Sequence, residues 1–233
     1  MFKTIVRWIP NTITCLNLLS GALACVFAFH ATETYGTLSG MQLCWILIGA
    51  AAVFDFCDGA AARMLRAYSE LGKELDSLSD LVSFGLAPAM LLLNVTDTLT
   101  GGSREMWTAL IIPVMGALRL ARFNIDDSQS TSFKGLPIPA NAIFWIGATA
   151  WLSQHGPVAG WLMAVVTVAV ALSMVCDMRM FSLKFKNFAL GENAVRYVQI
   201  AATALAVIIW GVSGLAAAIL LYMLLSAVTA RLR

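Results

Sequence analysis

Long apolar runs alternate with short polar ones along this chain of 233 residues. A helix that crosses a bilayer needs about 20 largely apolar residues. Eight stretches come close to this requirement, at 11–30, 41–62, 75–94, 105–123, 138–154, 157–176, 194–211 and 213–230. Only a few residues separate the fifth from the sixth and the seventh from the eighth, so each pair is predicted to form a tight hairpin. The pattern therefore predicts an all-α, polytopic membrane helix bundle of about eight transmembrane helices.

The first nine residues, "MFKTIVRWI", place Lys3 and Arg7 among apolar side chains. We predict that residues 1–9 form an amphipathic segment beside the membrane and that residues 10–233 form a single transmembrane domain. The following stretch, "PNTITCLNLLSG", interrupts its apolar run with proline, threonine and asparagine. A cleavable signal peptide has an uninterrupted apolar core, so we expect the first span to be retained.

Composition supports a membrane protein, because 60% of the residues are hydrophobic and only 12% are charged. Soluble domains have about one quarter of their residues charged. The formal net charge of +2 gives no indication of nucleic-acid binding. The five cysteines are scattered and form no CxxC pair, so we interpret them as small apolar residues rather than disulfides or metal ligands.

The basic residues gather on one side of the predicted membrane. With both termini in the cytoplasm, fourteen of the fifteen Lys and Arg residues fall on the cytoplasmic side, and only Arg104 falls outside. Cytoplasmic loops of membrane proteins carry such an excess of positive charge. An odd number of spans would remove this bias. The distribution therefore predicts a protein of the cell (inner, cytoplasmic) membrane with both termini cytoplasmic, and it agrees with eight spans.

Four aspartates lie toward the cytoplasmic ends of the second and third predicted spans. Asp55 and Asp58 are three residues apart, and Asp76 and Asp80 are four apart, so each pair shares one helix face. A short connection makes the two helices antiparallel neighbours, and both acidic faces can meet. Converging carboxylates repel one another unless cations neutralise them. Oxygen ligands of this kind suit hard divalent cations such as Mg²⁺, Mn²⁺ or Ca²⁺.

An alternative interpretation is a collar of salt bridges with Arg63, Arg66 and Lys73. Two glycines favour a ligand site instead. Gly59 follows Asp58 beside three alanines, and Gly72 lies one turn before Asp76, so the neighbouring helix faces lack bulky side chains. Small residues also permit close packing between helices.

The spacing Asp55-x2-Asp58-Gly59-x2-Ala62-Arg63-x8-Gly72-x3-Asp76-x3-Asp80 resembles the complete signature of the CDP-alcohol phosphotransferase family. The resemblance implies a core of six membrane helices, an active site that faces the cytoplasm, and two divalent metal ions, Mg²⁺ or Mn²⁺, held by the four aspartates. It also implies that Arg63 binds the diphosphate of the donor and that Gly59, Ala62 and Gly72 contact its cytidine. Asp80 would be the catalytic base for the acceptor hydroxyl.

Other stretches resemble the bacterial and archaeal phosphatidylserine synthases of this family: "PNTITCLNLLSG" (10–21), "DLVSFGLAPA" (80–89), "GALRLARFNI" (116–125) and "FKGLPIPANA" (133–142). The likeness implies transfer of the phosphatidyl group from CDP-diacylglycerol to L-serine, with release of CMP. Arg119, Arg122 and Lys134 are candidate serine-binding residues, because cations favour the serine carboxylate. Membrane anchoring is the alternative role for the two arginines. Asn17 either lines the nucleotide pocket or bonds a neighbouring helix.

Charge alone does not identify the acceptor, since the same cations would also bind glycerol 3-phosphate or inositol phosphate. A membrane proton or cation transporter is a further alternative, because carboxylates inside membranes also mark transport paths. Transporters spread such acids over several spans near the midplane, whereas these acids cluster at one level. The resemblance also implies a homodimer, for which the pairs Gly36/Gly40 and Gly156/Gly160 are weak support.

Overall fold

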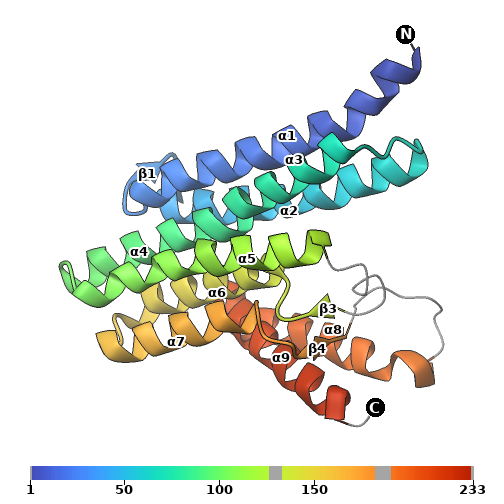
Figure 1. Cartoon of the computed structure of the whole chain (residues 1–233). Helices are drawn as coiled ribbons and strands as arrows, with labels where there is room; N and C mark the ends of the chain where they lie inside the picture. Colours follow the sequence, from blue (N-terminus) through green and yellow to red (C-terminus); the bar gives the residue numbers. More distant parts are fainter. Residues whose placement is uncertain (1, 126–132, 182–189, 232–233) are drawn as a thin grey trace.

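The computed structural model describes residues 2–125, 133–181 and 190–231. These residues are predominantly helical, and most of each of the eight predicted apolar stretches falls on helix (Figure 1). The principal helices are α1 (Phe2–Phe29), α2 (Gly40–Met64), α3 (Glu70–Asp80), α4 (Ala87–Thr100), α5 (Ile111–Ile125), α6 (Ile138–His155), α7 (Gly160–Ser173), α8 (Leu190–Trp210) and α9 (Gly214–Arg231). The shorter elements are η1 (Leu81–Leu86), η2 (Arg104–Leu110), η4 (Gly211–Ser213), β1 (Thr34–Tyr35), β2 (Leu38–Ser39), β3 (Phe133–Lys134) and β4 (Arg179–Met180).

Five helical ranges of the described chain are long and apolar enough to cross a membrane: Trp8–Phe29, Gly40–Met64, Glu70–Thr100, Arg104–Ile125 and Asn193–Ala230. The last range contains both α8 and α9. Many large apolar side chains of these helices are exposed on the outside of the bundle, as a surface in contact with lipid requires. The prediction of a helical membrane protein is confirmed, whereas the count of eight spans stays a prediction.

The N-terminal helix shows no break between the predicted surface segment and the first span. α1 runs continuously from Phe2 to Phe29 with Pro10 inside it. A proline removes one backbone donor from a helix. The side chains of residues 1–7 lie outside the described part, so the amphipathic character of residues 1–9 stays a prediction.

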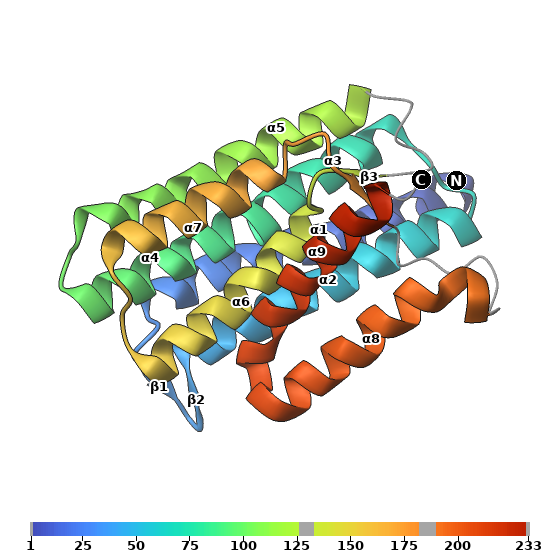
Figure 2. The ribbon, with the colours of Figure 1, turned by 90° about the horizontal axis from the view of Figure 1, so that it is seen from below.

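The helices form layers around a buried centre. α1 packs along α2, and α3 packs against α1, so these three form one side of the bundle (Figure 1). α4 and α6 lie centrally. Trp145 of α6 and Phe84 of η1, directly before α4, are fully buried. α8 packs on α9 at the edge of the bundle, as the second view shows (Figure 2).

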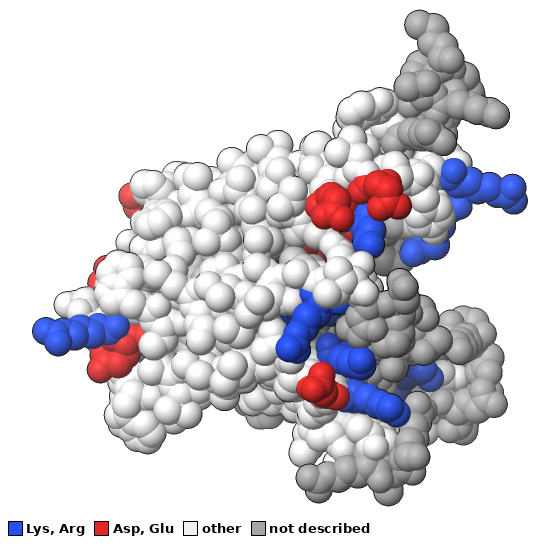
Figure 3. All heavy atoms as spheres, viewed as in Figure 1, with Lys and Arg blue, Asp and Glu red and all other residues white. Residues whose placement is uncertain are grey.

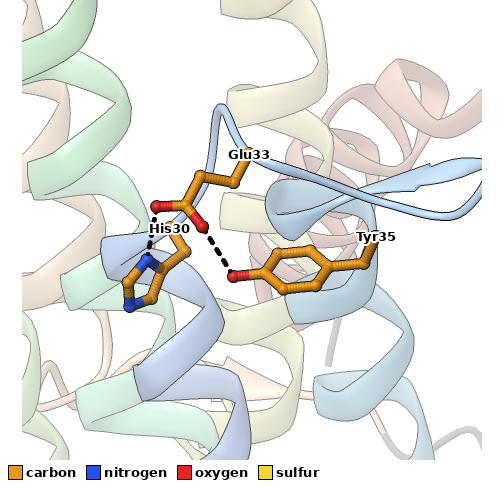
Figure 4. A network of polar contacts seen from close by, with 3 residues as sticks. All are labelled: His30, Glu33 and Tyr35. Carbon is orange, nitrogen blue, oxygen red and sulfur yellow. Dashed lines mark hydrogen bonds and ion pairs between the residues drawn. The ribbon is translucent and has the colours of Figure 1, made fainter.

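A small polar network closes the turn between α1 and α2 (Figure 4). His30 Nδ1 lies 2.7 Å from Glu33 Oε1, and the Tyr35 hydroxyl donates to Glu33 Oε2 at 2.9 Å. These hydrogen bonds, the one with His30 first, lower the pKa of Glu33. The β1–β2 pair follows directly, and Ser39 caps the start of α2.

A π-helical turn directly follows the last aspartate. α3 ends at Asp80, and η1 occupies Leu81–Leu86 before α4 begins. Pro88 has no N–H to donate to the carbonyls of the preceding turn. The Asn141 side chain of α6 donates to the Phe84 carbonyl at 3.1 Å, and its oxygen accepts from Trp145 Nε1 at 3.0 Å. π-helical turns are frequent at functional sites, and this one joins α6 to the helix that carries the acids.

Candidate active site

Three of the four aspartates predicted as metal ligands come together in the structure. Asp55 from α2 and Asp76 and Asp80 from α3 each offer a carboxylate oxygen, and these three oxygens lie within 4.8 Å of one another. We call these residues the acid group. They meet because the acidic faces of the two helices turn toward each other, as the spacing predicted.

Asp58 lies beside the acid group rather than in it. Its side chain is buried, and it interacts electrostatically with both Asp76 and Asp80. One oxygen of Asp58 and one of Asp76 are buried without a hydrogen-bond partner in the described residues. A buried polar atom without a partner is costly, so each oxygen is placed as a ligand atom would be.

α1 holds the acid-bearing helix through side-chain contacts. Asn17 Nδ2 donates to Asp80 Oδ1 at 3.2 Å, and the Ser83 hydroxyl donates to the Asn17 carbonyl at 3.0 Å. The Ser79 hydroxyl lies 3.3 Å from the Thr14 carbonyl. Gly21 allows this approach, because an added Cβ would overlap the Ser83 hydroxyl. Asn17 therefore bonds a neighbouring helix, and its predicted place in the nucleotide pocket stays a prediction.

The acid group fits a hard divalent cation. Its ligand atoms are carboxylate oxygens, which Mg²⁺ and Mn²⁺ prefer. The alternative of a salt-bridge collar finds no support at Asp58 and Asp76, whose unpartnered oxygens are described above. Lys73, one proposed member of that collar, instead donates from Nζ to the Asn124 carbonyl at 3.1 Å. The number and identity of the ions stay predictions.

A cavity of about 230 Å³ opens beside the acid group. Three predicted donor-binding residues line it: Gly59, Ala62 and Gly72. The other lining residues are Pro10, Asn11, Thr14, Asp58, Ala67, Tyr68, Ser69, Lys73 and Asp76. We call this space the donor cavity. Asn17 is fully buried and is not among the residues that line it.

The two glycines of the motif have different surroundings. A Cβ at Gly59 would meet only Arg63 Nη1, at 3.7 Å, so Arg63 lies over an otherwise open helix face. A Cβ at Gly72 would lie 3.0 Å from both Asn11 Oδ1 and Ser69 Oγ. Gly59 therefore leaves open space, as predicted, whereas Gly72 also allows α1 to approach the start of α3.

A second cavity, of about 280 Å³, contains the three predicted acceptor residues. Arg119 and Arg122 from α5 and Lys134 from β3 line it with Ile125, Met174, Val175, Cys176 and Asp177. We call this space the basic cavity. Arg119 is 8% exposed, its Nε has no hydrogen-bond partner in the described residues, and it interacts electrostatically with Asp80. Arg119 therefore connects the basic cavity with the acid group.

Several residues near the two cavities were not predicted from the sequence. Asn11, Thr14 and Tyr68 line the donor cavity, and Asp177 lines the basic one. The polar stretch at the start of the first predicted span could have indicated Asn11 and Thr14 as site residues. Asp177 is a single aspartate in a loop, and no pattern in the sequence indicated it. Tyr222 of α9 interacts electrostatically with Arg119 and donates to the Phe181 carbonyl at 2.8 Å.

On the face shown in Figure 3, basic side chains gather toward one end of the molecule, and a further basic group lies at the opposite end. The division of all fifteen Lys and Arg residues between the two sides of a membrane stays a prediction. The part of the chain that the structure describes contains no disulfide, and Cys44 is buried whereas Cys15 and Cys57 are exposed.

Known proteins support this interpretation of the site. A model of the CDP-alcohol phosphatidyltransferase family matches residues 7–175. The chain is similar to the CDP-diacylglycerol–serine O-phosphatidyltransferase of Methanocaldococcus jannaschii, with 33% identity over 171 residues, which cover 73% of this chain and 72% of the relative. The enzyme of the same name from Bacillus subtilis is 39% identical over 133 residues, 57% of this chain and 70% of the relative.

A third enzyme of this name, from Mycobacterium leprae, is 37% identical over 161 residues, which cover 66% of this chain and 49% of the relative. The match thus spans about half the length of that relative and about seven tenths of the other two. The family model covers most of the chain and includes the complete aspartate motif. The chain therefore belongs to the CDP-alcohol phosphatidyltransferase family.

Proposed function

We propose that this protein is a phosphatidylserine synthase, which transfers the phosphatidyl group of CDP-diacylglycerol to the hydroxyl of L-serine and releases CMP. The observation that carries the proposal is that the acid group borders one cavity and interacts with a residue of a second cavity of different chemistry. Asp76 is both a member of the acid group and a wall residue of the donor cavity. Asp80 interacts with Arg119, which lines the basic cavity. The names of the relatives support serine as the acceptor.

The two cavities divide the substrates between them. The donor cavity has small residues and carboxylates along its wall, and we assign it to the cytidine and diphosphate of the donor, with Arg63 on the diphosphate. The basic cavity receives the serine carboxylate through Arg119, Arg122 and Lys134, since charge-assisted hydrogen bonds are the strong ones. The acceptor hydroxyl then lies next to Asp80.

The reaction forms one phosphorus–oxygen bond and breaks another. The serine oxygen attacks the phosphatidyl phosphorus, the bond to the CMP oxygen breaks, and the hydroxyl proton passes to the Asp80 carboxylate, which acts as general base. The Asn17 amide donates to one Asp80 oxygen and leaves the other for this proton. Two divalent ions, Mg²⁺ or Mn²⁺, held by Asp55, Asp58, Asp76 and Asp80, would neutralise charge on the phosphates.

The same proposal places the enzyme in the cell (inner) membrane. Eight spans, with both termini and the active site in the cytoplasm, would put fourteen cations on the cytoplasmic side. Residues 10–233 then form one catalytic domain, and the enzyme is a homodimer. The diacylglycerol tails of donor and product stay in the bilayer while the reacting groups meet at its inner surface.

A panel of acceptors tests the function directly. The purified chain in detergent receives CDP-diacylglycerol, Mg²⁺ or Mn²⁺, and one acceptor at a time: L-serine, glycerol 3-phosphate or inositol phosphate. We expect CMP release and a lipid product with L-serine alone, and no release after the ions are removed with EDTA. Release with a phosphorylated acceptor but not with serine would assign another reaction of the family. Release of no CMP under any condition would contradict the proposal.

A further inference from the structure

The basic cavity contains one acidic side chain that the proposed chemistry has not used. Asp177 lines this cavity with Arg119, Arg122 and Lys134. Its side chain is exposed, and in residues 2–125, 133–181 and 190–231 no ion pair or hydrogen bond engages its carboxylate. A carboxylate among three cations would usually form an ion pair with one of them. The Asp177 carboxylate is therefore available to a ligand in the cavity.

The backbone on both sides of Asp177 is held in place. Arg122 Nη1 donates to the Val175 carbonyl at 2.8 Å, which joins this turn to α5. The Gly135 N–H donates to the Met178 carbonyl at 2.9 Å, where β3 and β4 begin to pair. Gly135 has φ = 75°, a conformation that favours glycine. The position of Asp177 relative to the cations is thus fixed by the fold rather than by a free loop.

The charges of the cavity match an amino acid better than a phosphorylated alcohol. L-serine has a carboxylate for the cations and an ammonium group that attracts a carboxylate. Glycerol 3-phosphate and inositol phosphate have anionic groups only, and Asp177 would repel them. Discrimination between ligands often depends on such a repulsive element as well as on attraction. A cavity with three cations alone would favour the phosphorylated acceptors instead.

We propose that Asp177 binds the ammonium group of the acceptor and thereby selects a zwitterionic alcohol over a phosphorylated one. The proposal rests on the proposed function and names the residue that distinguishes serine from the other acceptors. Arg119, Arg122 and Lys134 hold the carboxylate, and Asp177 holds the ammonium group at the same α-carbon. The hydroxymethyl group of serine is then free to extend toward Asp80.

Two acceptors that differ only in the ammonium group provide the test. L-serine is compared with 3-hydroxypropionate, which keeps the hydroxyl and the carboxylate and lacks the amino group. CMP release is measured for the wild type, Asp177→Asn and Asp177→Glu in the full-length protein. For Asp177→Asn we expect the KM for serine to rise at least about tenfold, as the loss of a charged hydrogen bond predicts. The KM for CDP-diacylglycerol should not change, and kcat/KM for 3-hydroxypropionate should not fall. Asp177→Glu should recover part of the serine affinity.

Asp97→Asn is the matched control, because it removes the same charge near the far end of α4, and it should behave as the wild type. An equal loss on both acceptors, or a changed KM for the donor, would show that Asp177 only maintains the fold and would overturn the proposal. Serine kinetics unchanged by Asp177→Asn would overturn it while the proposed function stands. A wild type that does not use serine would overturn both.

Discussion

Replacement of Asp76 by asparagine should have opposite effects on stability without and with divalent ions. The ligand oxygens of the acid group lie within 4.8 Å of one another. Two unit charges at this distance repel by about 3.5 kcal/mol at an effective dielectric constant of about 20. The substitution removes the repulsion of Asp76 with both Asp55 and Asp80. Proton uptake by the three acids relieves much of this energy, so we expect the metal-free variant to gain at least about 1 kcal/mol.

Thermal unfolding of the protein in detergent, followed by tryptophan fluorescence, measures both effects. With EDTA, the Asp76→Asn variant should unfold about 2–4 °C above the wild type for each kcal/mol gained. With Mn²⁺ at about 100 times its dissociation constant, the wild type should gain about 2.7 kcal/mol from binding. The variant should gain little, since it has lost one of three clustered ligands, and its CMP release should be lost.

The control is Asp97→Asn, which removes one carboxylate far from the acid group and should leave the response to Mn²⁺ unchanged. The reasoning would be refuted if Asp76→Asn kept the full stabilisation by Mn²⁺, because Asp76 would then not be a ligand. A metal-free variant less stable than the wild type would also refute it, because the three carboxylates would then not repel one another in the folded protein.

Two further substitutions test contacts that support the site. Gly21→Ala should destabilise the protein by about 1–3 kcal/mol in thermal or denaturant unfolding, because its Cβ would overlap the Ser83 hydroxyl and lie 2.6 Å from Ser83 Cα. The control is Gly49→Ala, whose Cβ would meet nothing within 4 Å and which should not destabilise the protein. Equal stability of the two variants would contradict the close packing of α1 on η1. Tyr222→Phe removes the hydroxyl that donates to the Phe181 carbonyl at 2.8 Å. Because Tyr222 interacts with Arg119 of the basic cavity, this change should raise the KM for serine severalfold and leave the KM for CDP-diacylglycerol unchanged, whereas Tyr35→Phe should change neither KM in steady-state assays of CMP release. A rise in both KM values for Tyr222→Phe would contradict a specific role of Tyr222 in serine binding.

The acid group was predictable from the sequence because it depends on helix geometry and one short connection. Residues three and four apart share a helix face, and two consecutive helices joined by a few residues are antiparallel neighbours. Asp55, Asp76 and Asp80 follow from these rules alone. Asp58 shows their limit, since it shares the face of Asp55 by spacing yet lies beside the three clustered oxygens.

The remaining parts of the site depend on contacts between distant segments, which no local pattern encodes. Asn17 bonds Asp80, 63 residues later in the chain. The basic cavity joins α5 and β3 to the turn after α7. Sequence patterns supplied the cations of this cavity through the family resemblance, but the spacing gave no reason to bring Asp177 to them. Tyr222 belongs to a helix beyond the region that the family model matches.

The order of the helices along the chain has a consequence for how the enzyme is made. All residues of the acid group belong to the first three helices, as do the α1 groups that hold the acid-bearing helix: the Asn17 side chain and the carbonyls of Thr14 and Asn17. A nascent chain that has entered the bilayer as far as α4 therefore already contains the three aspartates and the α1 groups that hold their helix. The basic cavity needs segments that the ribosome delivers later, up to the turn after α7. All residues of the acid group are thus synthesised before the residues that complete the basic cavity.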